Sequence, residues 1–245
     1  MIIGLIPSRL NSTRLNQKPL IEIDGLPIII HTLKRAQLSK KLDEVIVCTD
    51  DKKILNVVEK HGGKAILTSK KHKNGTERIY EVAKKIKKAN LIVDIQGDMP
   101  LLQPLSIDRT IEFHKKNQNF DIVLPSMPIK SGAGNKSIVK NIFSKNRIIY
   151  FSREKTPFSY SKKNITFYKH LSIISFKPDA LKKFNKAKMG DIEKIEGIEL
   201  MRALEIGLRI GTFVIKGSDF AVDVTEDLIK AMSEMTSDNI RKSYK

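Results

Sequence analysis

The sequence contains one cysteine, no tryptophan and few aromatic residues, which make up 6% of its 245 residues. The single cysteine, Cys48, cannot form a disulfide within the chain, and its place in the apolar run EVIVCTD predicts a small buried residue. No apolar run approaches the roughly 20 residues that cross a membrane. Met1 leads directly into a strand pattern, without the basic flank of a signal peptide. We therefore expect a cytoplasmic protein without membrane insertion.

Negative charge is also scarce, because 45 Lys and Arg residues face 27 Asp and Glu residues and the formal net charge is +18. Such an excess favours polyanionic partners. A nucleic-acid-binding protein is one interpretation, but its bases would need aromatic side chains to stack on, and the lysines here stand in runs such as KKHK and KKIKK without them. We expect lysine-rich, solvated helix faces and no nucleic acid as the main partner.

The first half of the chain alternates between strand and helix patterns. Short β-branched runs predict strands, and apolar residues at helical spacing predict the helices between them. This succession predicts an α/β fold with a doubly wound, mostly parallel sheet. The expected strands are 2–7, 44–50, 64–68 and 90–98, and the expected helices are 27–39, 52–63 and 77–88.

The second half is less regular. We expect strands at 121–130 and 165–176, a helix at 196–207, a strand at 209–217 and a terminal helix capped near Thr225. The run FAVDVTED reads as a strand that ends at Asp223. The pattern indicates a single domain, 1–245, with a substrate-side insertion around 126–220.

The loop after the first strand, IPSRLNSTRLNQKPL, has no glycine where a dinucleotide-binding strand would have several. The missing GxGxxG argues against NAD, and the missing GxxxxGK[ST] argues against P-loop hydrolysis. Arginine, lysine and small polar residues are instead typical of a loop that binds phosphate. Because ligands lie beyond the carboxyl ends of parallel strands, we expect this loop to share one rim with 49–50, 68–76 and 96–98.

Two aspartates on this rim are candidate metal ligands. DIQGDMP places Asp98 at a strand end, and FAVDVTED does the same for Asp223. Mg²⁺ is usually held by one or two carboxylates together with substrate phosphate. The alternative is structural: Asp98 would start the turn before Pro100, and Asp223 would cap the terminal helix.

Several motifs together carry a resemblance that covers nearly the whole chain. PSRLNSTRLNQKPL, HKNGTER, DIQGDMPLL, YKHLSIISF and FAVDVTEDL follow one another in the same order as in the nucleotide-sugar cytidylyltransferases. The sequence is most similar to the 3-deoxy-manno-octulosonate cytidylyltransferase (CMP-Kdo synthetase) family. The resemblance implies a Rossmann-like nucleotidyltransferase fold and a Mg²⁺-dependent reaction of CTP with Kdo. The products would be CMP-Kdo for lipopolysaccharide biosynthesis and pyrophosphate.

The resemblance also implies a role for individual residues. It divides the domain into a nucleotide-binding half (1–125), a sugar-binding and dimerisation part (126–220), and a metal-binding strand end with the terminal helix (221–245). Arg9, Lys18, Asp98 and Asp223 would be catalytic, with Asp98 and Asp223 as the metal ligands. CTP would contact Pro7, Ser8, Arg9, Ser12, Thr13, Arg14, Lys18, Thr68, Gly75, Thr76, Gln96 and Asp98. The sugar acid would contact Arg78, Gln96, His170, Glu196 and Glu199. A homodimer would form through the irregular region 126–195.

One departure from the family pattern concerns the sugar. Leu200 stands where a sugar-contacting glutamine is expected, and the lost amide removes hydrogen bonds to sugar hydroxyls. Another acidic sugar therefore remains an alternative substrate: a sialic or legionaminic acid, or an 8-amino Kdo-like acid. A relative that binds CTP without turnover is a further alternative.

Overall fold

The computed structural model describes residues 1–12, 14–129, 131–161, 164–216 and 221–244. The chain divides into two units, Met1–Asp108 with Ser218–Lys245 and Arg109–Gly217. The first unit is therefore built from both ends of the sequence. The division of the sequence at 125 and 220 stays a prediction. Among the described residues, no helix combines the length and the apolar character needed to span a membrane.

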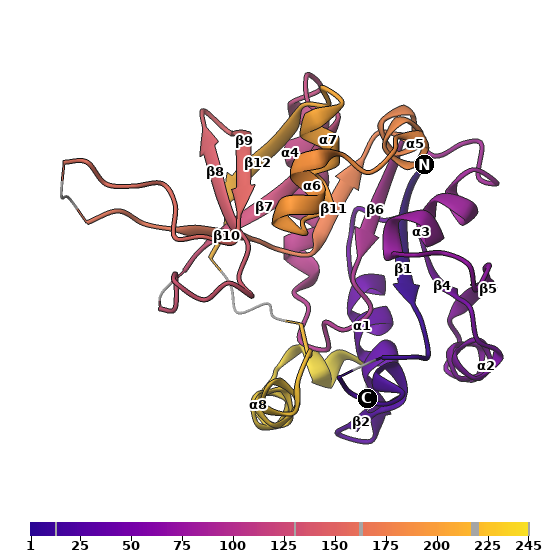
Figure 1. Cartoon of the computed structure of the whole chain (residues 1–245). Coiled ribbons are helices and arrows are strands. Elements are labelled where there is room, and N and C mark those ends of the chain that lie inside the picture. The colour runs from indigo at the N-terminus through magenta and orange to yellow at the C-terminus, as the bar shows by residue number, and fades with distance from the viewer. Residues whose placement is uncertain (13, 130, 162–163, 217–220, 245) are drawn as a thin grey trace. The chain divides into compact units, whose positions relative to one another are not determined.

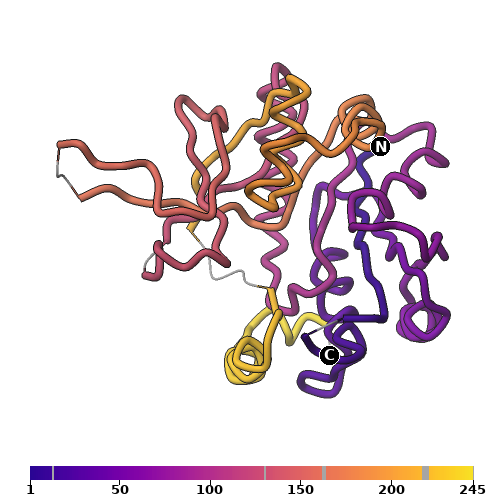
Figure 2. The backbone as a smooth tube through the Cα atoms, viewed as in Figure 1, coloured from indigo at the N-terminus to yellow at the C-terminus, as the bar shows by residue number. Residues whose placement is uncertain are grey.

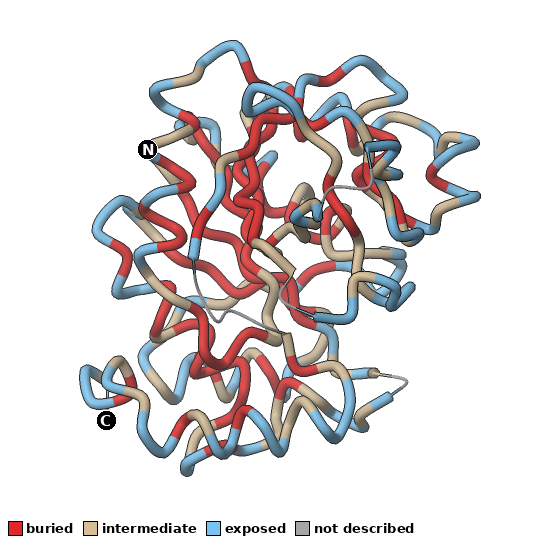
Figure 3. The backbone as a smooth tube through the Cα atoms, turned by 90° about the vertical axis from the view of Figure 1, so that its left-hand side faces the viewer, coloured by how far each residue is buried: buried red, intermediate tan, exposed pale blue. Residues whose placement is uncertain are grey.

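The first unit contains a four-stranded parallel sheet. Its strand order is β6 (Leu91–Ile95), β1 (Ile2–Ser8), β4 (Glu44–Thr49) and β5 (Lys64–Leu67), and all three pairings are parallel. Figure 1 shows β1 among its neighbours. The chain becomes buried directly after the labelled N-terminus, and β1 stays buried from Ile3 to Ser8 (Figure 3). Apolar runs such as IIGLIP suit a strand that is covered on both faces. Cys48 is buried in β4, as predicted.

Three helices connect these strands. α1 (Ile28–Gln37) packs on β1 and β4, α2 (Lys52–Lys60) on β4 and β5, and α3 (Gly75–Ala83) on β1, β4 and β6. Asp51 caps α2 and Asn74 caps α3, each through a side-chain oxygen that accepts a backbone N–H. The Asn74 cap starts α3 two residues earlier than predicted. Before α1 the chain forms a 3-10 turn, η1 (Lys18–Leu20), and a small hairpin of β2 (Glu22–Ile23) and β3 (Leu26–Pro27).

The C-terminal part of the first unit consists of α8 (Thr225–Thr236) and the 3-10 segment η2 (Ile240–Tyr244). The predicted strand ending at Asp223 is wrong for the described residues 221–224, which belong to no strand. The segment is held by a backbone hydrogen bond from Val222 N to Asp98 O (2.9 Å) rather than by a ladder. Asp227 Oδ2 then accepts the N–H groups of Asp223 and Val224, which starts α8.

Arg35 of α1 holds this C-terminal part in place. Its side chain is fully buried and donates to Asp238 Oδ1 (2.8 Å), Tyr244 Oη (2.9 Å) and Leu102 O (3.3 Å). The Tyr244 hydroxyl also contacts His31 Nδ1 (3.0 Å), so the chain end lies beside α1 (Figure 2). Arg35 thus links the segment after β6 to the end of α8 within one buried network.

The second unit is built around a mostly antiparallel sheet. Its strands are β7 (Ile122–Pro128), β8 (Lys140–Ser144), β9 (Arg147–Ser152), β10 (Tyr168–His170), β11 (Ile173–Phe176) and β12 (Ile210–Val214). The strands follow the order β8-β9-β12-β7-β11, and β10 pairs with β7 and β8. Only the pairing of β12 with β7 is parallel among those described. The helices are α5 (Pro178–Lys186), α6 (Asp191–Glu196), α7 (Leu200–Glu205) and the part of α4 (Pro104–Lys116) from Arg109 onward.

Two predicted elements of the second unit are interrupted. The helix expected at 196–207 begins only at Leu200, as α7, because Gly197 adopts φ +60°, a left-handed conformation that ends the separate helix α6. The strand expected at 165–176 is divided between β10 and β11 at residues 171–172. Sequence analysis did not identify α4, α5, α6, β8 or β9.

His114 of α4 is a buried neutral histidine, and we expect it to make stability depend on pH. Its Nδ1 contacts Ser175 Oγ (2.8 Å), its Nε2 contacts Phe120 O (3.3 Å), and burial lowers its pKa to about 4. Above about pH 6.5 neither the folded nor the unfolded state carries the proton. As the pH falls toward 4, only the unfolded chain is protonated, so stability falls by roughly 3 kcal/mol from this group. Unfolding midpoints from pH 7.5 to 4.5 should therefore decline less in His114→Gln than in the wild type; equal declines would contradict the prediction.

Candidate active site

One apolar cluster in the first unit anchors the segments that carry the predicted site. Leu15 and Ile21 flank Lys18, Leu101 follows Asp98, and Val222 precedes Asp223. These residues pack with others from β2, α1 and α8, namely Ile23, Ile28, Leu228, Ala231 and Met235. Burial of their apolar surface brings together charged residues that are up to 209 positions apart in sequence.

A cavity of about 340 Å³ lies beside this cluster, within the first unit. It is formed by the loop after β1, the loop before α3, the turn after β6 and the segment before α8. Positive side chains outnumber negative ones in its wall, as expected for a site that binds a polyanion. The lining residues are Pro7, Ser8, Arg9, Asn11, Ser12, Arg14, Lys18, Pro19, His72, Lys73, Asn74, Gly75, Arg78, Gln96, Gly97, Asp98 and Asp223.

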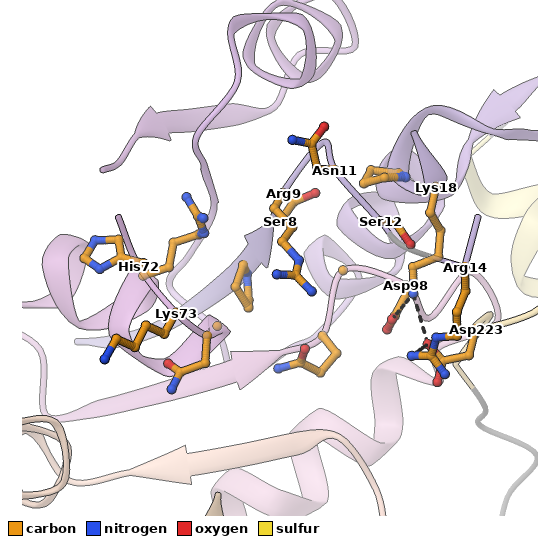
Figure 4. Close-up of a pocket in the computed structure, with 17 residues that line it drawn as sticks. Ser8, Arg9, Asn11, Ser12, Arg14, Lys18, His72, Lys73, Asp98 and Asp223 are labelled. Atoms are coloured by element: carbon orange, nitrogen blue, oxygen red, sulfur yellow. Dashed lines mark hydrogen bonds and ion pairs between the residues drawn. The ribbon is translucent and has the colours of Figure 1, made fainter. Parts of the chain in front are cut away.

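Lys18 holds the two predicted metal ligands together. Its Nζ lies 2.6 Å from Asp98 Oδ2 and 3.2 Å from Asp223 Oδ1, and Arg14 Nη2 lies 2.9 Å from the same Asp223 oxygen. The Lys18 side chain is 13% exposed, whereas that of Asp223 is 40% exposed. Figure 4 shows these four side chains on one side of the pocket. The carboxylates of Asp98 and Asp223 thus converge on a single cationic group.

The opposite side of the pocket is formed by the start of α3 (Figure 4), where His72 and Lys73 are drawn. Asn74 caps the helix, and Glu77 Oε2 accepts the N–H of Lys73. His72 is held by Glu81, whose Oε2 lies 2.6 Å from His72 Nε2 and also accepts the N–H of Ser69. These two hydrogen bonds lower the pKa of Glu81. The first turn of α3 thus presents its positive dipole end and Lys73 to the pocket.

Two glycines allow the backbone segments of the pocket to approach one another. A Cβ atom on Gly97 would lie 2.9 Å from Pro7 O, and one on Gly75 would lie 3.1 Å from Pro7 Cγ. A larger residue at Gly97 would therefore push the turn that carries Asp98 away from the end of β1.

Two buried polar atoms of the pocket have no hydrogen-bond partner within the described part of the chain. They are Ser8 Oγ and Asp98 Oδ1. An unsatisfied buried polar atom is costly, and a bound ligand or ion is a common reason for it. Asp98 is the more informative case, because its other oxygen is already bound by Lys18.

The structure brings most of the predicted CTP residues to this pocket, but not all. Pro7, Ser8, Arg9, Ser12, Arg14, Lys18, Gly75, Gln96 and Asp98 line it, whereas Thr68 and Thr76 do not. Thr68 Oγ1 donates to Thr49 O (2.9 Å) and accepts from Arg78 Nη1 (2.6 Å). Its hydroxyl thus links the ends of β4 and β5 to α3. Thr13 lies outside the described residues.

Of the predicted sugar residues, Arg78 and Gln96 line the pocket, while the other three belong to the second unit. Arg78 is 3% exposed and its guanidinium also binds Asp50 Oδ2 (2.8 Å). Glu196 accepts hydrogen bonds from Ser152 Oγ (3.0 Å) and Arg153 N (3.0 Å) at the end of β9. His170 lies on β10, where burial lowers its pKa. Glu199 precedes α7 and Leu200 begins it, with the Leu200 side chain buried. The roles of these residues stay predictions.

Sequence analysis missed several lining residues, namely Asn11, Pro19, His72, Lys73, Asn74 and Gly97. Asn11 and Pro19 belong to the loop singled out above, and His72 to Asn74 belong to HKNGTER. The motifs thus identified the right segments of the chain. Whether the side chains of residues 72–74 point into the pocket depends on the Asn74 cap and on the contact between His72 and Glu81, which the motifs do not reveal. Across the described residues, no three His, Cys, Asp or Glu side chains gather as a metal cluster, so Asp98 and Asp223 remain a pair.

Comparison with known proteins identifies the family. The family model described as cytidylyltransferase matches residues 3–210. This chain belongs to that family. The 3-deoxy-manno-octulosonate cytidylyltransferase of Thermodesulfovibrio yellowstonii is 39% identical over 241 residues, covering 92% of this chain and 94% of the relative. The 8-amino-3,8-dideoxy-manno-octulosonate cytidylyltransferase of Shewanella pealeana is 35% identical, covering 96% and 98%.

A solved structure of CMP:2-keto-3-deoxy-manno-octonic acid synthetase in complex with CTP is also similar to this cytidylyltransferase. It superposes with a TM-score of 0.92 at 29% identity, covering 96% of this chain and 98% of that one. The predicted α/β nucleotidyltransferase fold and the predicted family are thereby confirmed. The protein is an enzyme of the nucleotidyltransferase class.

Proposed function

We propose that this cytidylyltransferase transfers the cytidylyl group of CTP to Kdo, forming CMP-Kdo and pyrophosphate. The observation that carries the proposal is the convergence of Asp98 and Asp223 on Lys18 in a pocket lined mainly by cations. Nucleotidyl transfer needs charge neutralisation and alignment more than covalent help from the protein. This pocket has the side chains for both.

The triphosphate would bind between the loop after β1 and the start of α3. Arg9 is exposed in the pocket wall, and Lys18 lies opposite Lys73. The N–H groups at the start of α3 add a partial positive charge on the same side. Arg9 and Lys18 would neutralise the negative charge that develops on the reacting α-phosphate and on the leaving phosphates.

The two carboxylates fit Mg²⁺, which we propose as the cofactor. Asp98 and Asp223 are oxygen donors within reach of one cation, and Asp98 Oδ1 is buried without a partner in the described chain. Mg²⁺ commonly takes one or two carboxylates and fills its other positions with phosphate oxygens and water. Asp98 and Asp223 would hold the ion, which would neutralise phosphate charge, and Lys18 would add positive charge beside it.

The transfer itself exchanges one phosphorus–oxygen bond for another. The anomeric hydroxyl oxygen of the sugar acid bonds to the α-phosphorus and gives up its proton to water, and the bond between the α-phosphorus and the oxygen bridging to the β-phosphate breaks. Pyrophosphate leaves with the electron pair of that bond. The protein's part is to hold the two substrates in line and to stabilise the charge on the leaving group.

The sugar acid needs a site for its carboxylate, for which Arg78 is suited by its planar guanidinium. Gln96 lies in the same wall. The relatives include enzymes named for Kdo and for 8-amino-3,8-dideoxy-manno-octulosonate, so the 8-amino sugar acid is the alternative substrate. Leu200, buried at the start of α7, offers no amide to a hydroxyl group.

A substrate screen tests the proposal. The protein is incubated with each of the four ribonucleoside triphosphates, Mg²⁺ and one acid from a set of Kdo, 8-amino Kdo and sialic acid, and pyrophosphate release is recorded. We expect the highest kcat/KM with CTP and Kdo, and loss of turnover when EDTA removes Mg²⁺. Higher kcat/KM with another acid would reassign the sugar, and no release with any acid would refute the proposed reaction.

We further propose a cytoplasmic homodimer that serves lipopolysaccharide biosynthesis. In the second unit, within the region 126–195, several apolar side chains are exposed: Ile149, Phe158, Tyr160 and Ile195 are between 57% and 91% exposed. Exposed apolar patches of this kind are typical of interfaces. The molar mass in solution decides between one copy and two.

A further inference from the structure

Asp94 is a carboxylate inside the parallel sheet of the first unit. It is 1% exposed in β6, where its neighbours Val93 and Ile95 are fully buried. Burying a charged group costs free energy unless it is compensated by specific partners. Nothing in the reaction described above uses Asp94 directly, so its position calls for another reason.

The side chain of Gln96 is one partner of Asp94, and it connects Asp94 to the pocket. Its Nε2 lies 3.2 Å from Asp94 Oδ1 and 3.3 Å from Asp94 Oδ2. Gln96 is the first residue after β6, and residues two apart along an extended backbone point to the same side. An ionised carboxylate only accepts hydrogen bonds, and only the nitrogen of an amide can donate them. Asp94 therefore fixes which way the amide of Gln96 is turned.

The consequence concerns what the pocket can recognise. Gln96 lines the pocket, and its Nε2 lies 3.7 Å from where a Cβ of Gly75 would stand. With the NH₂ group turned to Asp94, the other end of the amide is its carbonyl oxygen, which accepts and never donates. A ligand that contacts this carbonyl oxygen must then offer a donor, such as a hydroxyl or an amino group.

We propose that Asp94 is a positioning residue that orients Gln96, so that the pocket presents a hydrogen-bond acceptor to its substrate. The identity of the substrates rests on the proposed function. The donor is either a hydroxyl group of the sugar acid or the 4-amino group of cytosine. Asp94 contributes to specificity without touching either of them.

An exchange of the two groups tests this. Gln96→Glu places two carboxylates against each other, and we expect kcat/KM to fall about 30-fold, as for a disrupted charged hydrogen bond. Asp94→Asn alone lets either amide turn, with an expected loss of about tenfold. In the double variant the amide introduced at 94 donates to the carboxylate at 96, whose second oxygen is again an acceptor. Its kcat/KM should recover to within about fivefold of the wild type.

The substrate whose KM rises in the Asp94→Asn and Gln96→Glu variants identifies the donor group. A rise in KM for CTP, with weaker discrimination against UTP, assigns the contact to the cytosine amino group. A rise in KM for Kdo assigns it to a sugar hydroxyl. Asp108→Asn is the matched control, since Asp108 is also buried (8% exposed) and accepts from Ser39 Oγ (2.5 Å). This control should lower stability and leave both KM values unchanged.

A spectroscopic measurement separates this proposal from the proposed function. The side-chain amide resonance of Gln96 is assigned by its absence in Gln96→Glu, and it should shift in Asp94→Asn but not in Asp108→Asn. If it shifts in a protein that releases no pyrophosphate, the proposed function fails while the role of Asp94 stands. If it does not shift in an active enzyme, or if the double variant is no better than Gln96→Glu, the role of Asp94 is refuted.

Discussion

Replacing Asp98 by asparagine is expected to lower kcat at least about 100-fold, because one of the two carboxylates that we propose to act at the reacting phosphate loses its charge. Asp98 contacts Lys18 through Oδ2 and has a buried Oδ1 without a partner in the described chain. An amide cannot replace a carboxylate as a strong ligand of Mg²⁺. Initial rates of pyrophosphate release at saturating CTP and Kdo measure the effect.

Asp223→Asn is expected to lose activity too, but by a smaller factor than Asp98→Asn. The Asp223 side chain is 40% exposed and that of Asp98 is 23% exposed, so water screens the charge of Asp223 more effectively. In both variants the Mg²⁺ concentration that gives half-maximal activity should rise.

The control for both variants is Asp51→Asn. Asp51 is the N-cap of α2 outside the pocket, and asparagine caps helices equally well. It should retain full activity. A kcat of Asp98→Asn above about a tenth of the wild-type value would contradict the proposed metal site, because loss of a charge at the reacting phosphate should lower kcat by a larger factor.

Lys18→Met is expected to reduce kcat/KM for CTP by about 100-fold or more, through loss of a charge that we propose to stabilise the leaving phosphates. It should also alter the protein without substrate. The Lys18 ammonium contacts both Asp98 and Asp223. Its removal therefore leaves two neighbouring carboxylates without the positive charge that they share. We expect the unfolding midpoint to fall by about 2–4 °C, as for a loss near 1 kcal/mol in a chain of this size. Added Mg²⁺ alone should then raise the midpoint more in the variant than in the wild type.

Lys73→Met separates these effects from a general loss of positive charge. Lys73 lines the opposite side of the same pocket and is exposed. This variant should weaken CTP binding moderately and leave the response to Mg²⁺ unchanged. Identical behaviour of the two variants would show that Lys18 acts only through the net charge of the pocket.

The fold of the first unit could be predicted from the sequence because its signals are local. Apolar runs gave the four parallel strands, and caps such as Asp51 marked helix starts. The second unit was harder, since its strands pair mostly antiparallel and do not alternate regularly with helices. Gly197 shows the limit: only its left-handed backbone reveals that α6 ends there rather than continuing.

The site shows a similar division. Arg9, Lys18 and Gln96 could be placed on one rim because parallel strands end together. The position of Asp223 depends on long-range contacts, namely the Val222–Asp98 hydrogen bond and the apolar cluster beneath it. Thr68 lies on the predicted rim, but its hydroxyl bonds to Thr49 and Arg78 instead of lining the pocket. Such side-chain partners are decided by tertiary packing.

The discontinuous first unit has a consequence for how the enzyme matures on the ribosome. Lys18 and Asp98 are synthesised early, whereas Asp223 and its anchors Val222 and Met235 emerge only after the entire second unit. A nascent chain that ends within residues 109–216 therefore has the loop after β1, with Lys18, but lacks Asp223, one of the two acids that Lys18 contacts. The charged wall of the pocket is thus completed only among the last events of translation.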